Sequence, residues 1–262
     1  MDARRIVPAP PAWLTLAEQR AVFEFGAFLA ASPALRLIGR GDRHPVLVLP
    51  GFTAGDGSTE PLRWFLRGQG YWVHGWSLGR NLGPTRAVVN GLDARLAYVH
   101  ARHNRRVTLI GWSLGGLYAR MLARKHPDYV RQVITLGSPF QLRMGDRSAA
   151  EPLVRRLQQR FEPGALEDFM IPEPEKLPLG VPATSVYSKG DGVVRWYTCI
   201  DSPGDRRENI EVRGSHSGLG WNPAVLLAVA DRLAQREGSW RPFRPPPGLG
   251  HLYPSPEVYR AA

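Results

Sequence analysis

The feature that most constrains this chain is a serine placed between an apolar run and a helical pattern. Residues 107–110 are mostly apolar and partly β-branched, which predicts a buried strand. A helix is predicted directly afterwards over residues 114–125, because Leu117, Met121 and Leu122 share one face at helical spacing. Ser113 therefore lies in a sharp turn from strand to helix.

The residues on either side of Ser113 fit such a turn. Gly111 and Gly115 flank the serine at a distance of two residues, giving the pattern Gly-x-Ser-x-Gly. A serine at this corner has a strained backbone, so the residues two positions away must lack bulk. Its hydroxyl is then exposed at the N-terminus of a helix, where backbone N–H groups favour developing negative charge. The pattern is typical of a nucleophilic serine.

The same five letters, GWSLG, occur a second time around Ser77. Residues 80–84 (RNLGP) follow this copy, and they cannot start a helix at Ser77. Helical signals resume only after Pro84. We therefore predict that Ser113 is the nucleophile and that Ser77 is a loop serine at a strand end.

The chain is long enough for one domain with a substantial core, and its charge is unusually positive. It has 262 residues, a formal net charge of +11 and a pI near 10.5. Such charge can indicate nucleic acid, anionic lipid or an acidic substrate. However, the basic residues are dispersed and almost all are arginine, and no nucleic-acid recognition motif accompanies them. We expect no nucleic-acid partner, whereas transient contact with a membrane or lipid surface stays open.

Cysteine content and the N-terminal residues bear on location. Cys199 is the only cysteine, so it forms no intramolecular disulfide, and we expect it to be a small buried apolar residue. The N-terminus carries arginines followed by prolines instead of the apolar core of a signal peptide. The apolar stretch at residues 21–38 is interrupted by Glu24 and Pro33, which argues against a transmembrane helix. A cytoplasmic location is the expectation.

Most of the remaining chain alternates between strand and helix patterns. We predict strands at residues 45–49, 71–76, 107–110, 131–136, 183–187 and 209–212, and helices at residues 14–31, 58–67, 85–101, 114–125, 149–161 and 222–236. Continuous apolar strands predict an α/β fold with a mostly parallel sheet covered by helices on both faces. In the first helix, Leu16, Phe23 and Leu29 are expected to face inward.

Three segments do not follow the alternation. Residues 141–180 hold one predicted helix and a proline-rich return, and we predict a small cap or lid insertion above the carboxyl ends of the strands. Residues 1–44 form a helical lead-in, and residues 240–262 a proline-rich tail that packs along the surface. We predict a single domain over residues 1–262.

Reactive side chains follow three predicted strands in the order Ser113, Asp191 and His216. Nucleophile, acid and base in this order are the arrangement of the α/β-hydrolase fold. The chain resembles this family from about residue 46 to residue 236. The strings PGF, SLGG, LGSP, GDG and SHSG at its strand ends are similar to those of bacterial triacylglycerol lipases and carboxylesterases. Only strands three to eight of the family's eight are visible, which implies the sheet order 4-3-5-6-7-8.

The resemblance implies a role for each site residue. Ser113 attacks a carbonyl, His216 takes its proton through Nε2, and Asp191 accepts the other ring N–H. The oxyanion is bound by the backbone N–H groups of Leu114 and Phe52. Thr53 is an alternative to Phe52. No metal and no cofactor is implied.

Several residues compete for these roles. Asp191 could be only a turn residue, with Asp201 or Asp205 as the acid. Of the seven histidines, only His216 is placed in the loop after the last strand and downstream of the acid. His126 lies in a His-Pro-Asp sequence that ends a predicted helix, so we predict a structural role for it. The glycine-rich loop after the first strand is not a phosphate loop, because no Gly-Lys-Ser/Thr follows it.

The leading hypothesis is a serine esterase or lipase that cleaves a small or lipid-like carboxylic ester through an acyl-enzyme. Trp112 and Phe140 flank the predicted site and are candidates for the substrate pocket. Two alternatives stay open: the same triad acting on amide, thioester or polyester bonds, and a non-catalytic basic surface-binding module with a vestigial triad. The sequence does not indicate the oligomeric state.

Overall fold

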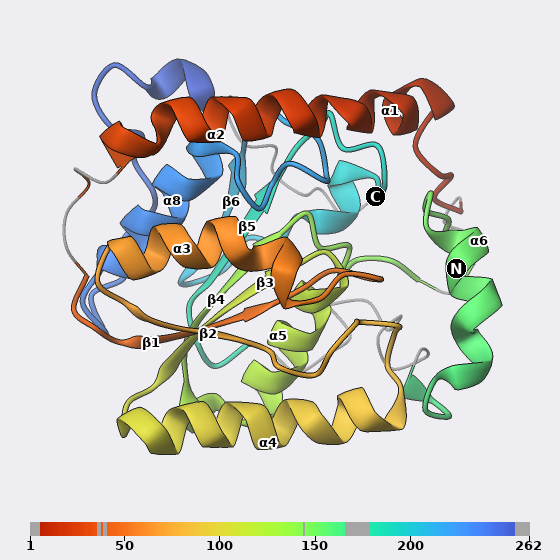
Figure 1. The fold of residues 1–262 in the computed structure, drawn as a ribbon, viewed down its shortest axis with the longest axis horizontal. Helices are drawn as coiled ribbons and strands as arrows, with labels where there is room; N and C mark the ends of the chain where they lie inside the picture. The colour runs from red at the N-terminus through yellow and green to blue at the C-terminus, as the bar shows by residue number, and fades with distance from the viewer. Residues whose placement is uncertain (1–5, 36–37, 39–40, 144, 166–178, 255–262) are drawn as a thin grey trace.

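Six parallel strands form the centre of the protein. The computed structural model describes residues 6–35, 38, 41–143, 145–165 and 179–254. The strands are β1 (Pro45–Leu49), β2 (Trp72–Gly75), β3 (Val107–Trp112), β4 (Val130–Leu136), β5 (Ala183–Tyr187) and β6 (Arg207–Glu211), and Figure 1 shows them as one twisted sheet. Their order is β2-β1-β3-β4-β5-β6. This is the predicted order 4-3-5-6-7-8 with the strands renumbered, so the predicted α/β fold and topology are confirmed.

The register of the sheet brings the carboxyl ends of the strands together. Leu49 of β1 pairs with Gly111 of β3, and Trp112 pairs with Leu136 of β4. Further along, Leu136 pairs with Val186 of β5. The loops that leave β1, β3, β4 and β5 therefore start side by side. Ligands of open parallel sheets bind at this edge.

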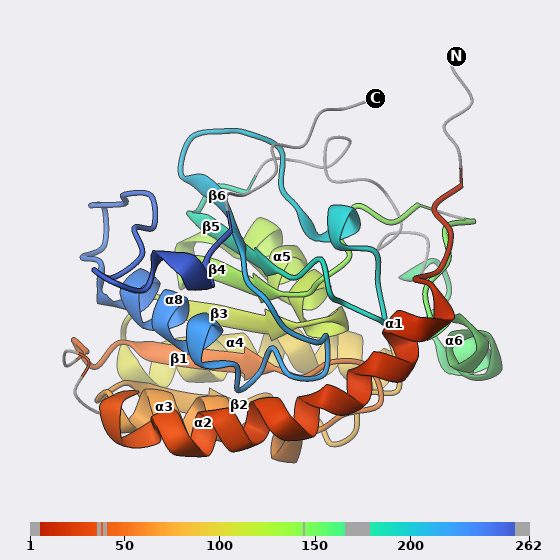
Figure 2. The ribbon, with the colours of Figure 1, turned by 90° about the horizontal axis from the view of Figure 1, so that it is seen from above.

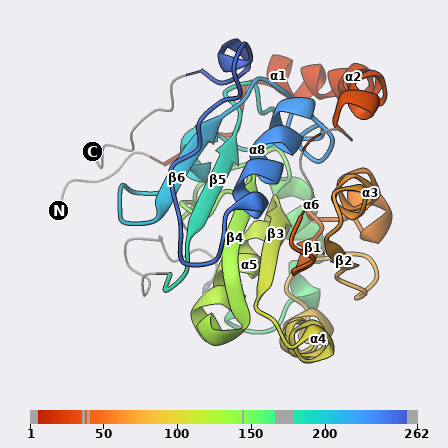
Figure 3. The same cartoon turned by 90° about the vertical axis from the view of Figure 1, so that its left-hand side faces the viewer.

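One face of the sheet is covered by α4 (Arg86–His103) and α5 (Leu114–Lys125). Figure 3 views the sheet from its side, with these two helices on one face of it. Alternate strand residues such as Leu47, Leu109 and Val133 point to this face and are fully or almost fully buried against the two helices. The helix predicted after Ser113 has the bounds expected from the sequence.

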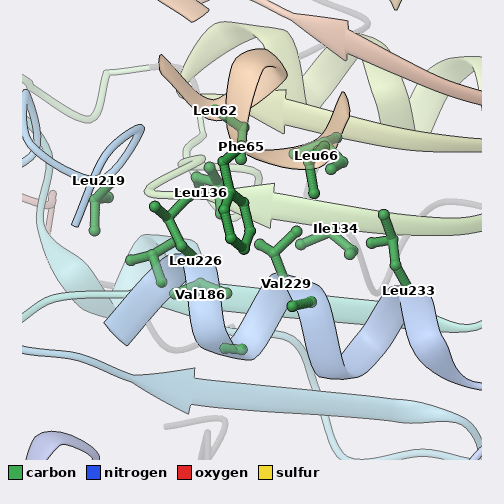
Figure 4. Close-up of a cluster of buried hydrophobic side chains, with 14 of the residues drawn as sticks. Leu62, Phe65, Leu66, Ile134, Leu136, Val186, Leu219, Leu226, Val229 and Leu233 are labelled. Carbon is green, nitrogen blue, oxygen red and sulfur yellow. The ribbon is translucent and has the colours of Figure 1, made fainter. Parts of the chain in front are cut away.

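The opposite face is covered by α2 (Ala21–Leu35), α3 (Glu60–Gly68) and α8 (Pro223–Ala234). The intervening strand residues Ile134, Leu136 and Val186 point this way. Figure 4 shows them between α3, which contributes Leu62, Phe65 and Leu66, and α8, which contributes Leu226, Val229 and Leu233. Because every strand residue of β1, β3, β4 and β5 is buried, the core consists of two apolar layers separated by the sheet.

The N-terminal helical segment lies along the edge of this second face. It comprises α1 (Ala12–Leu16), a 3₁₀ turn η1 (Ala17–Arg20) and α2, which Figure 2 shows as a nearly continuous rod. The predicted inward face was wrong: Leu16, Phe23 and Leu29 are 70%, 80% and 57% exposed. The buried side runs instead through Ala21, Phe28 and Leu35. The helix is apolar on nearly all sides, so its hydrophobic pattern does not select the face that packs.

The segment after β4 is tied to distant parts of the chain. It contains α6 (Glu151–Leu157) and the turn η4 (Gln158–Arg160), which together match the predicted helix at residues 149–161. The N–H of Arg147 donates to the carbonyl of Val7, and the guanidinium of Arg86 pairs with Glu162 at 3.0 Å. In Figures 1 and 2, α6 lies at the same end of the molecule as the start of α1. Residues 166–178 of the predicted cap lie outside the described residues, so a cap or lid at residues 141–180 stays a prediction.

The described residues also include the 3₁₀ turns η2 (Asp56–Thr59), η3 (Pro127–Tyr129), η6 (Trp196–Cys199) and η7 (Gly250–Leu252). Cys199 is fully buried, as predicted, and burial raises the pKa of its thiol. Among the residues that the structure describes, none of the helices combines the length and the apolar character needed to cross a bilayer.

Candidate active site

Ser113 has the strained backbone expected at a turn between a strand and a helix. It lies between the last residue of β3 and the first residue of α5, with φ +52° and ψ −122°. Its N–H donates to the carbonyl of Leu136 on the neighbouring strand at 2.8 Å. A Cβ on Gly111 would lie 2.3 Å from the carbonyl oxygen of Gly115, so the helix can begin this close to the strand only with glycine there. The strain is thus held by the sheet on one side and by α5 on the other.

The second copy of the motif has different surroundings. Ser77 also has a positive φ, +60°, but it is exposed and the next helix, α4, begins only at Arg86. Its N–H donates to a carboxylate oxygen of Asp56 at 3.1 Å. As predicted, a helix begins directly after Ser113 but not after Ser77. Ser113 as the nucleophile stays a prediction.

The structure brings Asp191 and His216 into contact. His216 Nδ1 lies 2.5 Å from Asp191 Oδ2, and both side chains are almost completely buried. The other carboxylate oxygen of Asp191 accepts the N–H groups of Val193 and Val194, each at 2.8 Å. These two bonds orient the carboxylate, which leaves Oδ2 for the imidazole. The carboxylate therefore fixes the ring so that Nδ1 carries the proton and Nε2 is available as a base.

The electrostatic environment of His216 favours its charged form. Burial lowers the pKa of the imidazole, but the carboxylates of Asp191 and Glu18 raise it more, and its pKa lies above the ordinary value. The same negative charges stabilise the imidazolium that forms when the imidazole takes a proton from a serine. The site therefore suits general-base chemistry by His216.

The other candidates for the acid have different partners. Asp201 forms a buried ion pair with Arg120 at 2.8 Å, with side-chain exposures of 3% and 2%. Asp205 is 93% exposed and lies 3.5 Å from Arg206. Of the three carboxylates considered from the sequence, Asp191 is the one in contact with His216.

Two further histidines contact carboxylates away from this edge of the sheet. His126, predicted to be structural, caps the end of α5 and lies 2.8 Å from Asp93. His44 lies 2.5 Å from Asp42 at the start of β1. A contact between histidine and aspartate is thus not specific to the site. His216 differs from the other two because it lies in the loop after β6, at the edge of the sheet where the strands end, and its carbonyl accepts the indole N–H of Trp112.

The predicted oxyanion donors lie next to Ser113. Leu114 is the first residue of α5, where backbone N–H groups have no partner within the helix. The pairing of Leu49 with Gly111 sets the loop that holds Phe52 and Thr53 beside the turn. The N–H of Thr53 donates to the carbonyl of Asn81 at 2.6 Å, which favours Phe52 over Thr53. Phe52 and Leu114 as oxyanion donors stay a prediction.

The two predicted pocket residues are buried. Trp112 is 8% exposed and packs edge-on against Trp221, with ring centroids 5.7 Å apart. Phe140 is 1% exposed, and the guanidinium carbon of Arg120 lies 4.0 Å from its ring centroid. Both side chains therefore pack in the core around the site, and a role for either in binding an acyl group stays a prediction.

Comparison with known proteins identifies the architecture. A family model described as the alpha/beta hydrolase fold matches residues 92–169, which include Ser113. Aspergillus fumigatus lipase B is similar with a TM-score of 0.58 and 17% identity, over 78% of this chain and 55% of that lipase. The monoacylglycerol lipase of Paleococcus ferrophilus is similar with a TM-score of 0.54 and 15% identity, over 75% of this chain and 96% of that lipase. The protein has the α/β-hydrolase fold.

Part of the chain is also similar in sequence to a curated esterase. The chain is 29% identical over 139 residues to the pimeloyl-(acyl-carrier protein) methyl ester esterase of Vibrio atlanticus (strain LGP32). The match covers 42% of this chain and 50% of that esterase, so the chain spans about half the length of the curated relative. These proteins are lipases and esterases, as the sequence resemblance predicted.

Within this α/β-hydrolase fold, Glu18 and Glu24 make contacts that were not predicted from the sequence. Both carboxylates, on the N-terminal helical segment, accept N–H groups of the loop that carries His216. The one signal in the sequence is that they are the only acidic residues in a largely apolar helical stretch at residues 12–35. Their partners lie more than 170 residues away, so no local pattern reveals them.

Proposed function

We propose that the protein is a serine hydrolase that cleaves carboxylic esters through an acyl-enzyme. The observation that carries this proposal is the contact of His216 with Asp191 at the sheet edge where Ser113 has a strained turn. The lipase and esterase folds among its structural neighbours and the methyl ester esterase relative support an ester as the substrate class.

In the first half of the reaction, His216 Nε2 takes the proton of the Ser113 hydroxyl as Oγ attacks the ester carbonyl carbon. The carbonyl oxygen becomes an oxyanion that accepts the N–H groups of Leu114 and Phe52. Each such donor contributes about 3–4 kcal/mol to the transition state in other hydrolases. The imidazolium then gives its proton to the leaving alcohol, and the acyl group stays on Ser113.

In the second half, His216 takes a proton from water, and the hydroxide attacks the acyl carbon. The imidazolium returns that proton to Ser113 Oγ as the carboxylic acid leaves. Asp191 stays ionised throughout and holds the Nδ1 proton of the imidazole. The whole cycle consumes one ester and one water and needs no other reactant.

The test uses the two copies of the pentapeptide as a matched pair. We expect the wild-type chain to hydrolyse a p-nitrophenyl ester and to be labelled by a fluorophosphonate probe, because only an activated serine reacts. Ser113→Ala abolishes both with the fold intact by circular dichroism, lowering kcat by about 10⁴-fold or more. Ser77→Ala, in the same five-letter context, keeps most activity. Loss of activity in a folded Ser77→Ala variant, or near-wild-type turnover in Ser113→Ala, contradicts the assignment.

A further inference from the structure

The N-terminal helical segment connects the two loops that carry the acid and the base. Glu18 Oε1 accepts the N–H of Gly192 at 2.9 Å and the N–H of His216 at 2.9 Å. Gly192 directly follows Asp191 in the chain. A single oxygen atom of η1 therefore joins the loop after β5 to the loop after β6.

The second oxygen of Glu18 extends this connection. Glu18 Oε2 accepts the N–H of Ser217 at 2.8 Å. Burial raises the pKa of the Glu18 carboxyl, but the hydrogen bonds from Ser217, His216 and Gly192 lower it more, so the net shift is downward. Glu18 is thus a carboxylate at neutral pH, with hydrogen bonds from three backbone N–H groups around the Asp191–His216 pair.

The N-terminal helical segment packs closely against the loop after β5 and the loop after β6. A Cβ on Gly192 would lie 2.2 Å from the carbonyl oxygen of Leu14, and a Cβ on Gly218 would overlap the carboxylate of Glu24. The hydroxyl of Thr15 also donates to the carbonyl of Gly192 at 2.8 Å. Two of the glycines in the GDG and SHSG strings are therefore required by the approach of the N-terminal segment.

We propose that Glu18 is a positioning residue: its carboxylate fixes the loops of Asp191 and His216 relative to each other and keeps a negative charge beside the imidazole. This inference rests on the proposed function of the triad. It assigns to a helix outside the sheet a part in the geometry of the site.

The charges that face His216 come from three elements. The carboxylate of Asp191 contacts Nδ1 of His216, and the carboxylate of Glu18 in η1 accepts the backbone N–H of His216. Glu24 of α2 accepts the N–H and the hydroxyl of Ser215, the preceding residue, but lies 3.5 Å from the guanidinium of Arg20. That guanidinium also donates to the carbonyls of the two loops, at Gly190 and Gly214. Asp191 and Glu18 are the two carboxylates that raise the pKa of His216.

Three variants separate the charge of Glu18 from its geometry. Glu18→Gln removes the charge and sets an amide against one of the three N–H donors. We expect kcat to fall roughly ten- to a hundredfold with KM little changed, because small misplacements of catalytic groups cost this much. The acid limb of kcat/KM, which reports the free His216, moves to lower pH because the imidazolium loses a stabilising charge. Glu18→Asp keeps the negative charge, but its shorter side chain draws the carboxylate away from the loops. We therefore expect kcat to fall while the acid limb of kcat/KM stays at the wild-type pH.

Glu24→Gln is the matched control, since Glu24 bonds the same loop one residue from His216. We expect its acid limb to stay at the wild-type position. Three outcomes overturn the inference: a folded Glu18→Gln enzyme with wild-type kcat and acid limb, a Glu18→Asp enzyme with wild-type kcat, or equal losses of kcat and Tm in all three variants with the limb unmoved. If Glu18→Gln does not fold, a comparison of kcat between Glu18→Asp and Glu24→Gln still tests the inference.

The outcome is distinguishable from failure of the proposed function. If wild-type protein neither hydrolyses esters nor reacts with the fluorophosphonate, or if Ser113→Ala keeps turnover, the serine-hydrolase proposal itself fails. If wild type is active through Ser113 and the Glu18 variants match it, only the positioning role of Glu18 fails.

Discussion

The indole nitrogen of Trp112 donates a hydrogen bond to the backbone carbonyl of His216 at 3.1 Å, across 104 residues of chain. Trp112 precedes Ser113, so this bond joins the turn of the serine to the loop of the histidine. In the second copy of the pentapeptide, the indole of Trp76 donates instead to Gly79 in its own loop at 2.9 Å. The same letters thus make a long-range contact in one copy and a local one in the other.

We expect Asp191→Asn to lower kcat by up to about 10⁴-fold with little change in fold. The Asn oxygen can still accept the N–H groups of Val193 and Val194, but its NH₂ group cannot accept the Nδ1 proton of His216. Steady-state hydrolysis and circular dichroism measure the two effects. The exposed Asp205 provides the control: Asp205→Asn should keep wild-type kcat. A dead Asp205→Asn enzyme with an active Asp191→Asn enzyme would show that the acid is misassigned.

Gly137→Ala tests the space beside the Asp191–His216 pair. A Cβ there would lie 2.7 Å from Leu219 Cδ1, 3.1 Å from His216 Nδ1 and 3.2 Å from Asp191 Oδ2, at a residue with φ +54°. The matched control is Gly238→Ala, which has φ +81° and no atom within 4 Å of the added Cβ. Both variants should lose about 1–2 kcal/mol of stability from the left-handed backbone. Only Gly137→Ala should also lose kcat, by roughly tenfold or more; equal kcat in the two variants would refute the crowding argument.

Stability should fall in mild acid because of His44. Burial and the charge of Arg131 lower the pKa of this imidazole to about 4 in the folded protein, against about 6.5 when unfolded. The Nδ1 atom of His44 lies 2.5 Å from Asp42 Oδ1, and its Nε2 atom lies 2.9 Å from Thr108 Oγ1. The folded state therefore binds fewer protons than the unfolded state between these values. The contribution of His44 to the free energy of unfolding is expected to be complete above pH 6.5 and to drop by about 3 kcal/mol as pH falls to 4.

Urea unfolding at pH 7 and pH 4 measures this difference. His44→Gln removes the titrating group, and the difference between the two pH values should shrink by about 3 kcal/mol. Replacement of the exposed His251 by Gln should leave the wild-type difference. An unchanged pH dependence in His44→Gln would mean that other groups cause the acid sensitivity.

The packing face of the N-terminal segment can be tested with two phenylalanines of α2. Phe28 is 4% exposed and meets Trp64 edge-on, with ring centroids 6.0 Å apart, whereas Phe23 is 80% exposed. We expect Phe28→Ala to lower the free energy of unfolding by about 3 kcal/mol. Phe23→Ala should change it by less than about 0.5 kcal/mol. Thermal or urea unfolding that ranked the two variants in the opposite order would restore the face expected from the sequence.

Local patterns were sufficient for much of the fold. The continuous apolar run at residues 45–49 located β1 to the residue, and helical spacing located α5 to the residue. The strand predicted at residues 183–187 also has the bounds of β5. Pro84 separated Ser77 from the next helix, which decided between the two copies of the pentapeptide. These features depend on interactions within about ten residues, so the chain carries them whatever its tertiary partners are.

The sequence by itself thus determined the strand–serine–helix turn at Ser113, the parallel α/β fold and the order of Ser113, Asp191 and His216. Only the tertiary structure decided which face of the N-terminal segment packs, because that segment is apolar nearly all round and its partner selects the side. It likewise decided the contact of Asp191 with His216 and the hydrogen bonds of Glu18, because each joins loops whose separation is fixed by the register of the sheet and not by the chain between them.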